Sequence, residues 1–364
     1  MTPILQILDE PGVSYVKVPR GDLSEVFITV AGGYGFDPAE KSDSLAVALG
    51  NGGGAGIVSV DRFDLVGCCG DEGQGEWPVT CIHGKSTRDP HLSGAHIHTV
   101  LGAPVETVRL GPRAVGRIFE DAYARYCILG DIRPDDASLP ATEQAYQAFE
   151  MMENALFAAD MDFSNVARTW LYLDDLLDWY KEFNGVRDKF FRERGVFDGI
   201  VPASTGIGAA NPQGTAIMAG AFAVQPKSPE VTIEPLPSPL QCAALQYGSS
   251  FSRALEVGTP DLRRLFVSGT ASIYPDGKSA HIGDVDAQID LTMQVVAAIL
   301  ESRGMGWGDV TRAIAYYKHA EDWTTFGKYC NAHSIPDMPV VIAHNDVCRD
   351  DLLFELEVDA IAAR

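Results

Sequence analysis

The sequence predicts an α+β protein made of two fused β-β-α-β-α-β units, in which helices pack on mixed sheets. The first observation is a repeat: residues 161–179 and 305–323 match without a gap, at an offset of 144 residues. The second is that both copies contain an Arg-x-x-x-Tyr run followed by Asp-Trp, a pattern typical of a strand leading into a helix. A fixed offset over this length indicates a duplicated supersecondary unit. The identical pairs are Met161/Met305, Val166/Val310, Arg168/Arg312, Tyr172/Tyr316, Asp178/Asp322 and Trp179/Trp323.

The second half of the chain carries the clearer element signals. Residues 252–257 alternate as a strand, and residues 264–273 form an apolar run that predicts the next one. Residues 286–303 have helical spacing of apolar side chains, with Gly304 as the C-cap. The remaining predicted elements are a strand at 310–317, a helix at 322–333, and strands at 340–344 and 352–362.

The first half gives the same order with a long interruption. Its predicted elements are strands at 15–18 and 26–31, a helix at 143–157, a strand at 166–173, a helix at 178–191 and a strand at 215–224. We therefore expect an N-terminal unit at 1–226 with an insertion at about 32–140, a Pro-rich linker at 227–239, and a C-terminal unit at 240–364. The Gly-rich stretch at 50–56 lacks a following Lys-Ser/Thr, so a flexible loop is favoured over a phosphate loop.

Composition excludes several classes of partner. The formal net charge is −22 and the pI about 4.6, so the chain repels phosphate backbones and anionic membranes. No apolar stretch reaches membrane-spanning length, and the N-terminus lacks a secretory signal pattern. We therefore expect a cytoplasmic protein with no nucleic-acid or membrane partner. An anionic substrate would need local arginines that act against the overall field.

Several motifs resemble the RidA/YjgF superfamily, and the tandem arrangement resembles its chorismatase branch. The strand ends Phe-Val-Ser-Gly-Thr at 266–270 and Phe-Glu-Leu-Glu-Val-Asp-Ala-Ile-Ala at 354–362 carry the resemblance, as does the element order. Further matching stretches are 202–208, 250–254, 268–273, 281–284 and Cys348-Arg349 with 352–355. The resemblance implies a cleft where the two units meet and a catalytic acid at Glu355. It also implies an oligomer, since superfamily members often assemble around threefold axes.

The sequence departs from the family in three places. RidA-type imine hydrolases have an arginine after a Pro-Ala pair, but Ser204 stands there in the first copy and Val341 or a neighbour in the second. This disfavours imine deamination. Relative to the chorismatase pattern, Leu171 stands where an Asn is expected, and Ala209-Ala210 precede Asn211 where an Arg is expected. These changes leave the exact substrate open.

Glu355 is the predicted general acid. The last strand alternates apolar and acidic residues, so period two places Glu355, Glu357 and Asp359 on one face. Burial beside other carboxylates would raise the pKa of Glu355 and keep it protonated. For Glu357 and Asp359 a solvent-exposed face is the simpler interpretation. Cys348 is a candidate catalytic residue by resemblance, although a lone buried cysteine is usually inert packing.

Substrate binding is expected from arginines, because planar guanidinium groups suit the two carboxylates of chorismate. The alternatives are structural: Arg168 would pair with an acid as its repeat partner does, and Arg349 with a neighbouring aspartate. Hydroxyl groups would hydrogen-bond substrate oxygens. The candidate binding residues are Arg168, Arg187, Arg253, Arg349, Tyr172, Ser268, Thr270 and Thr205.

Histidines 83, 91, 96 and 98 form the one group that raises the question of a metal. Three imidazoles can bind zinc, but no zinc-binding motif accompanies them, so surface histidines are favoured. We expect neither a metal nor an organic cofactor.

The leading hypothesis is a chorismatase-like enzyme that cleaves the enolpyruvyl ether of chorismate or an analogue and releases pyruvate. The alternative is a cofactor-free cyclase or isomerase of a biosynthetic pathway that acts on a reactive carbonyl compound. A third hypothesis is a non-catalytic small-molecule binding protein. In each case the partner is a small anionic or carbonyl-containing molecule, and the protein is expected to be a homo-oligomer.

Overall fold

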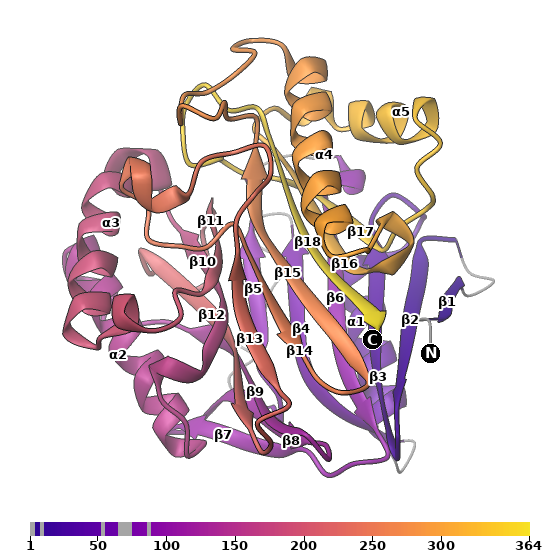
Figure 1. Ribbon diagram of the computed structural model, residues 1–364, viewed down its shortest axis with the longest axis vertical. Helices are drawn as coiled ribbons and strands as arrows, with labels where there is room; N and C mark the ends of the chain where they lie inside the picture. Colours follow the sequence, from indigo (N-terminus) through magenta and orange to yellow (C-terminus); the bar gives the residue numbers. More distant parts are fainter. Residues whose placement is uncertain (1–3, 8–10, 52–54, 65–74, 86–88) are drawn as a thin grey trace.

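Three six-stranded sheets pack around a common centre in the computed structural model, with the helices on the outside (Figure 1). The structure describes residues 4–7, 11–51, 55–64, 75–85 and 89–364. The two ends of the chain lie on the same side of the molecule (Figure 1).

Each sheet comes from one contiguous part of the chain. The first contains β1 (Ile4–Ile7), β2 (Val13–Arg20), β3 (Leu23–Ala31), β4 (Ala55–Asp64), β5 (Val79–His83) and β6 (Gly94–Leu101), with helix α1 (Pro38–Asn51). The second contains β7 (Glu106–Leu110), β8 (Arg113–Glu120), β9 (Ala124–Ile132), β10 (Val166–Leu173), β11 (Ala203–Gly208) and β12 (Ile217–Pro226), with helices α2 (Ala141–Ala158) and α3 (Leu176–Glu193). The third contains β13 (Thr232–Leu236), β14 (Ala254–Gly258), β15 (Leu262–Ala271), β16 (Val310–Tyr317), β17 (Val340–His344) and β18 (Phe354–Ala363), with helices α4 (Val285–Ser302) and α5 (Thr324–Ala332).

The three sheets have the same strand order. Numbered within each sheet, it is 1-2-3-6-4-5, with the fourth and fifth strands parallel and all other pairs antiparallel. A register shift recurs at the same place in the fourth strand, between Ile57 and Ser59, Val166 and Arg168, and Val310 and Arg312. A shared order with a shared irregularity indicates one supersecondary unit present three times.

The α+β class with mixed sheets of fused units is confirmed, and the strands predicted at 166–173, 310–317 and 340–344 have those bounds. The number of sheets and the assignment of the first strands differ from the prediction. Segments 15–18 and 26–31 lie in β2 and β3, which pair with each other. β3 also pairs with β6, so both segments belong to the first sheet and not to the sheet of the strands that accompany α2. The expected insertion at 32–140 thus completes the first sheet and begins the second.

The Pro-rich segment at 227–239 is also more than a linker. Its residues 232–236 form β13, which pairs along its whole length with β14. Proline is tolerated there because β13 is an edge strand. We therefore propose three units, with boundaries near residues 103 and 230, in place of the predicted two.

Apolar side chains explain both the layers and their assembly. One face of each sheet packs against its own helices, as with Phe149 and Phe190 in the second unit and Met293 and Phe354 in the third. The other faces meet in shared clusters, where side chains from all three sheets, among them Phe63, pack together. None of the described helices is long and apolar enough to cross a membrane.

Candidate active site

A pocket lies at the junction of the second and third sheets, and we call it the Glu355 pocket. Helix α3 and strand β11 form one wall; β15, β18 and the loops before β14 and β18 form the other. Its cavity volume is about 40 Å³, within an empty space of about 510 Å³ that includes the mouth. A ten-carbon substrate would require the pocket to widen. The lining residues are Tyr180, Arg187, Ser204, Gly206, Ser249, Phe251, Arg253, Gly269, Ala271, Ile273, Cys348, Arg349 and Glu355.

Glu355 lies at the floor of this pocket, near the start of β18, and only 3% of it is exposed. Its carboxyl group sits against the backbone of Gly269, where an added Cβ would meet the Glu355 Oε1 atom at 2.0 Å. The glycine in the Ser-Gly-Thr run therefore makes room for the acid. The equivalent strand positions in the other two sheets are Met218 and Gly94, so this acid is present once.

The environment of Glu355 favours its protonated form. Burial is the main cause that raises its pKa, to about 8, and the neighbouring carboxylate of Glu357 adds to it; Arg168 and Arg253 act in the opposite direction. At neutral pH the group is therefore mostly a neutral carboxylic acid, which can donate a proton.

Glu357 is the charged partner behind this acid. It has no exposed surface and pairs with Arg168 at 3.3 Å and with Arg312, while the Trp170 Nε1–H donates to its carboxylate at 2.7 Å. Burial acts to raise its pKa, but the two guanidinium groups hold the pKa well below the usual range. The predicted solvent-exposed face is therefore wrong for Glu357, and also for Asp359, which is 8% exposed and lies 3.6 Å from Arg312.

Three of the predicted arginines line the Glu355 pocket: Arg187, Arg253 and Arg349. Arg187 extends from α3, where its Nη2–H donates to Asn184 at 2.6 Å. The Arg253 Nε–H donates to the Cys242 carbonyl at 2.9 Å, and the Arg349 Nη1–H to the Gly277 carbonyl at 2.8 Å. These bonds fix each guanidinium group at the pocket wall. The three guanidinium groups thus place positive charge in the pocket of a chain whose net charge is negative. An anionic ligand needs such a local positive charge to bind.

Cys348 also lines the pocket, beside Glu355. Burial raises the pKa of its thiol to about 12, and the nearby Glu355 adds to the effect. The neutral thiol is therefore the form present at pH 7, which argues against a free thiolate nucleophile.

The structure places the other predicted binding residues outside the pocket lining. Arg168 is fully buried and its Nη2–H donates to Thr205 Oγ1 at 2.6 Å, in keeping with the structural alternative. Thr205 also accepts from the Gly269 N–H. The Ser268 hydroxyl donates to the Ser252 carbonyl at 2.6 Å, and the Thr270 hydroxyl donates to the Ser268 carbonyl. These residues therefore form hydrogen bonds beside Glu355, outside the pocket lining, and help to hold the acid in position.

The sequence interpretation missed part of the lining. Tyr180 and Ser204 come from the second unit, and Ser249, Phe251 and Ile273 from the third. The signal for Tyr180 was present, since it precedes Arg187 by two helical turns on the same face. Ser249 and Phe251 belong to an irregular loop, for which periodicity predicts nothing.

The two departures from the chorismatase pattern lie away from the pocket. Leu171 is fully buried in the helix-facing core of the second sheet. Ala209 packs in the apolar cluster shared by the three sheets, and the Ala210 carbonyl accepts from the His83 N–H at 2.9 Å. Both substitutions therefore affect packing more directly than they affect the chemistry of the pocket.

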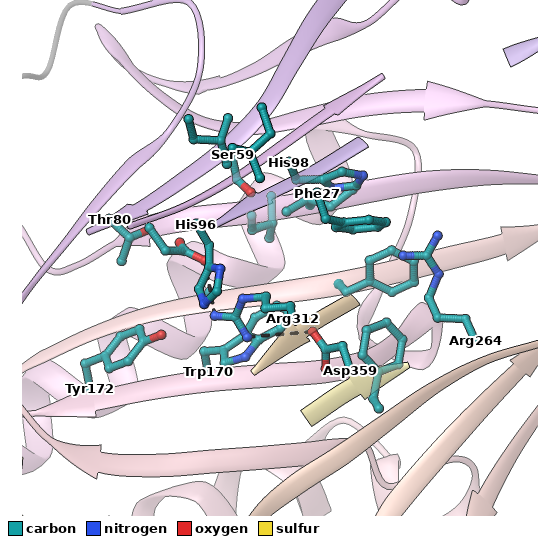
Figure 2. A pocket seen from close by; sticks show the side chains of 18 residues that line it. Phe27, Ser59, Thr80, His96, His98, Trp170, Tyr172, Arg264, Arg312 and Asp359 are labelled. Carbon is teal, nitrogen blue, oxygen red and sulfur yellow. Dashed lines mark hydrogen bonds and ion pairs between the residues drawn. The ribbon is translucent and has the colours of Figure 1, made fainter. Parts of the chain in front are cut away.

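A second cavity lies where the inner faces of the three sheets meet (Figure 2). Its volume is about 60 Å³, which suits a few water molecules. Figure 2 shows Arg312 in its wall between His96, Trp170 and Asp359. Tyr172 lines this cavity and not the Glu355 pocket. With its charged groups paired to one another, it is part of the structural core.

The predicted surface location is wrong for three of the four histidines. His83 and His96 are buried, and the His96 Nδ1 lies 3.0 Å from Thr29 Oγ1. His98 is largely buried, and its Nε2 lies 3.0 Å from Glu25. Within the described ranges, no group of three His, Cys, Asp or Glu side chains is placed to hold a metal ion.

The chain is similar to known proteins both in sequence and in fold. Residues 243–364 match the family model described as Endoribonuclease L-PSP. The chain is 31% identical over 222 residues to a chorismatase of Streptomyces rapamycinicus (54% of this chain, 64% of that protein). It is 28% identical over 257 residues to a 3-hydroxybenzoate synthase of Streptomyces hygroscopicus (63% of this chain, 71% of that protein).

A solved chorismatase structure matches with a TM-score of 0.62 and 22% identity, and the match covers 84% of this chain and 92% of that one. The matches span 64% and 60% of the length of the two chorismatases similar to this chain in sequence, somewhat under two thirds. The predicted resemblance to the RidA/YjgF superfamily and to its chorismatase-like branch is confirmed.

Proposed function

We propose that the protein cleaves the enolpyruvyl ether of chorismate or a close analogue and releases pyruvate. The observation that carries this proposal is the meeting, in one pocket, of a buried protonated acid and three arginines. The similarity to proteins named chorismatase and 3-hydroxybenzoate synthase supports it.

Glu355 acts as the general acid. Its neutral carboxyl group donates a proton to the methylene carbon of the enol ether, and the adjacent carbon becomes an oxocarbenium ion. The carboxylate that forms is stabilised by Arg253, which faces the same pocket and favours the charged form of Glu355. General acid catalysis of this kind contributes about 10²–10⁴ in rate.

The arginines bind and orient the dianion. Chorismate carries one carboxylate on the ring and one on the enolpyruvyl group, and guanidinium groups can bind such carboxylates through two parallel hydrogen bonds. Arg187 on the α3 wall and Arg253 with Arg349 on the opposite wall provide cations on two sides. A substrate held between them presents its ether to the floor, where Glu355 lies.

Two products are consistent with this first step. Addition of water to the oxocarbenium ion gives a hemiketal that collapses to pyruvate and a dihydroxycyclohexadiene carboxylate. Addition of the ring hydroxyl, followed by loss of pyruvate and rearrangement, gives 3-hydroxybenzoate without net consumption of water. Cys348 and Ala271, which both line the pocket, would contact the ring in either route.

The test is incubation of the purified protein with chorismate, with pyruvate measured by coupled oxidation of NADH and the ring product identified by mass spectrometry. Pyruvate formed in equal amount to chorismate consumed supports the proposal. Chorismate that remains intact at high protein concentration would exclude it. The departures at Leu171 and Ala209 lie outside the pocket lining, so they do not favour the cyclase or isomerase alternative over cleavage of chorismate. Homo-oligomerisation remains a prediction.

A further inference from the structure

A large cleft lies at another junction, between the third sheet and the first, and we call it the Trp323 cleft. Its volume is about 600 Å³, within the usual range for small-molecule sites. Helix α5, the loop that follows it and β17 form one wall; β2 and the segments after β3 and around residue 91 form the other. Its lining includes Ser14, Tyr34, His91, Trp323, Thr324, Phe326, Gly327, Asn331, Ile335, Met338, Val340 and Ile342.

Strand register shows that the Trp323 cleft is the repeat equivalent of the Glu355 pocket. Thr169 pairs with Ser204 in the second unit, and at the same place in the third unit Ala313 pairs with Val340. Ser204 lines one site and Val340 the other. On the opposite walls, Ala271 opposes Glu355 as Ala31 opposes Gly94, and both alanines line their sites.

The chemistry of the Glu355 pocket is missing from this equivalent cleft. Gly94 takes the place of the acid, and Val341 packs where an acid side chain would stand, since an added Cβ on Gly94 would meet the Val341 Cγ2 atom at 2.7 Å. At the offset of 144 residues, Asn331 stands for Arg187. By strand register, Ser14 stands for Arg253. The cleft therefore cannot act on a dicarboxylate as the Glu355 pocket would.

What the cleft has instead is a fixed aromatic wall. The rings of His91 and Trp323 stack with centroids 4.3 Å apart and planes 11° apart. Asp89 holds this pair: its Oδ1 accepts from the His91 N–H at 3.0 Å and lies 2.8 Å from the His91 Nδ1. Although partial burial acts to raise it, the pKa of Asp89 is lowered by bonds from the backbone and ring of His91 and from the Trp323 side chain. A carboxylate thus holds both rings in place.

The remaining lining is mostly apolar and carries little net charge. Ile335, Met338 and Ile342 contribute aliphatic surface, and Tyr34, 54% exposed, adds a third aromatic ring. Among the described lining residues, Lys328 and Asp337 bring opposite charges. Neutral donors and acceptors come from Ser14, Thr324 and Asn331. A cleft of this kind favours a flat, uncharged ligand over an anion, because the chain as a whole repels negative charge.

We propose that the Trp323 cleft is a second small-molecule site, which binds an uncharged aromatic ring against the His91–Trp323 pair. It is independent of the proposed chemistry at Glu355. The neutral side chains of Ser14, Thr324 and Asn331 hydrogen-bond polar substituents of the ring, and Tyr34 covers it at the mouth.

The probe for the test is 3-fluorobenzamide, titrated into the full chain and followed by fluorine NMR. For a ligand of ten heavy atoms we expect a Kd of about 1 mM or tighter. The charged analogue 3-fluorobenzoate should bind this cleft at least about tenfold more weakly, as expected from the charge argument. A preference for the benzoate in the cleft would overturn the assignment.

Two glycines provide a blocking variant and its matched control. Gly327 on α5 lines the cleft, is exposed, and has no atom within 4 Å of an added Cβ, so Gly327→Phe fills the cleft without a backbone clash. Gly185 on α3 is also exposed and open, and it lines neither site. We expect Gly327→Phe to weaken 3-fluorobenzamide binding at least about tenfold and Gly185→Phe to leave it unchanged.

A third variant, Trp323→Leu, removes half of the aromatic wall and should weaken binding about two- to tenfold. Pyruvate release by Gly327→Phe should equal that of the wild type, because the substitution is remote from the Glu355 pocket. No binding to the wild type, or equal binding to Gly327→Phe and wild type, would overturn the proposal. So would concentration-dependent dimerisation of the wild type that Gly327→Phe abolishes, since the occupant would then be a second copy of the chain.

Discussion

Burial and, after it, the charge of Glu357 raise the pKa of Glu355, and Glu357→Gln tests the contribution of Glu357. The two residues are separated by one position on β18 and face the same side, so their carboxyl groups lie about 6.6 Å apart along the strand. At an effective dielectric constant of about 20, two unit charges at this distance interact by about 2.5 kcal/mol. Removal of the Glu357 charge should therefore lower the pKa of Glu355 by about 1.8, from about 8 toward 6.

The assay is the pH dependence of kcat/KM for pyruvate release. Activity needs the protonated acid, so it falls as the pH rises through the pKa of Glu355. In Glu357→Gln this descending limb should begin near pH 6 in place of 8, with about a 15-fold loss of activity at pH 7.5. A descending limb that stays near pH 8 in a folded variant would refute the reasoning.

Stability must be followed in parallel. Glu357 pairs with Arg168 and Arg312 in the core, and loss of one partner of a buried ion pair costs about 3–5 kcal/mol. Asp359→Asn is the milder companion, because Asp359 lies one step further along the same face at about 13 Å. It should move the limb by at most about 0.9 in the same direction, because Arg312, at 3.6 Å from Asp359, offsets part of its charge. A limb that moves further in Asp359→Asn than in Glu357→Gln would contradict the electrostatic coupling.

Three further outcomes are expected. Arg253→Met should raise KM for chorismate at least about tenfold. It should also move the descending limb of the pH profile to higher pH, since Arg253 favours the charged form of Glu355. An unchanged KM would contradict the binding role of Arg253. Gly269→Ala should reduce kcat about 10²-fold without unfolding the protein, because its Cβ would displace the Glu355 carboxyl group; a kcat near that of the wild type would contradict this placement. Glu355→Gln should be more stable than the wild type at pH 9 and similar at pH 4. Burial raises the folded-state pKa of Glu355 from 4.5 to about 8, so the stability of the wild type is lost as pH rises between these two values, by at most about 5 kcal/mol in all. Equal thermal unfolding temperatures at pH 9 would contradict the raised pKa.

The sequence predicted α2 and β10 of the second unit and α4 and β16 of the third well, because their signals are strong, but it missed β7, β8, β9 and β11. The match at a fixed offset, the apolar alternation and the Asp-Trp pairs located strands 166–173 and 310–317 correctly. The first unit was missed because it lacks these identities. At the places of Arg168 and Tyr172 it has Ser59 and Phe63. Its equivalence appears only in the strand order and in the shared register shift.

From the sequence we predicted the acid, the cysteine and the three arginines that line the Glu355 pocket. We did not predict the buried ion pairs of Glu357 with Arg168 and Arg312. Period two correctly placed Glu355, Glu357 and Asp359 on one face, yet it could not tell a solvent-exposed face from a buried junction between sheets. That distinction depends on the first sheet, which supplies Asp61 at 3.3 Å from Arg312. Contacts between residues 251 positions apart leave no local pattern in the sequence.

Pyruvate release from chorismate at pH 6.5 by the wild type and by Glu355→Gln, measured side by side, tests the central claim most directly. The pair differs by one buried proton donor at nearly constant volume. We predict that the wild type releases pyruvate and that the variant is slower by about 10²–10⁴ at saturating substrate while still binding chorismate. A variant that keeps a rate within about threefold of the wild type would contradict general acid catalysis by Glu355.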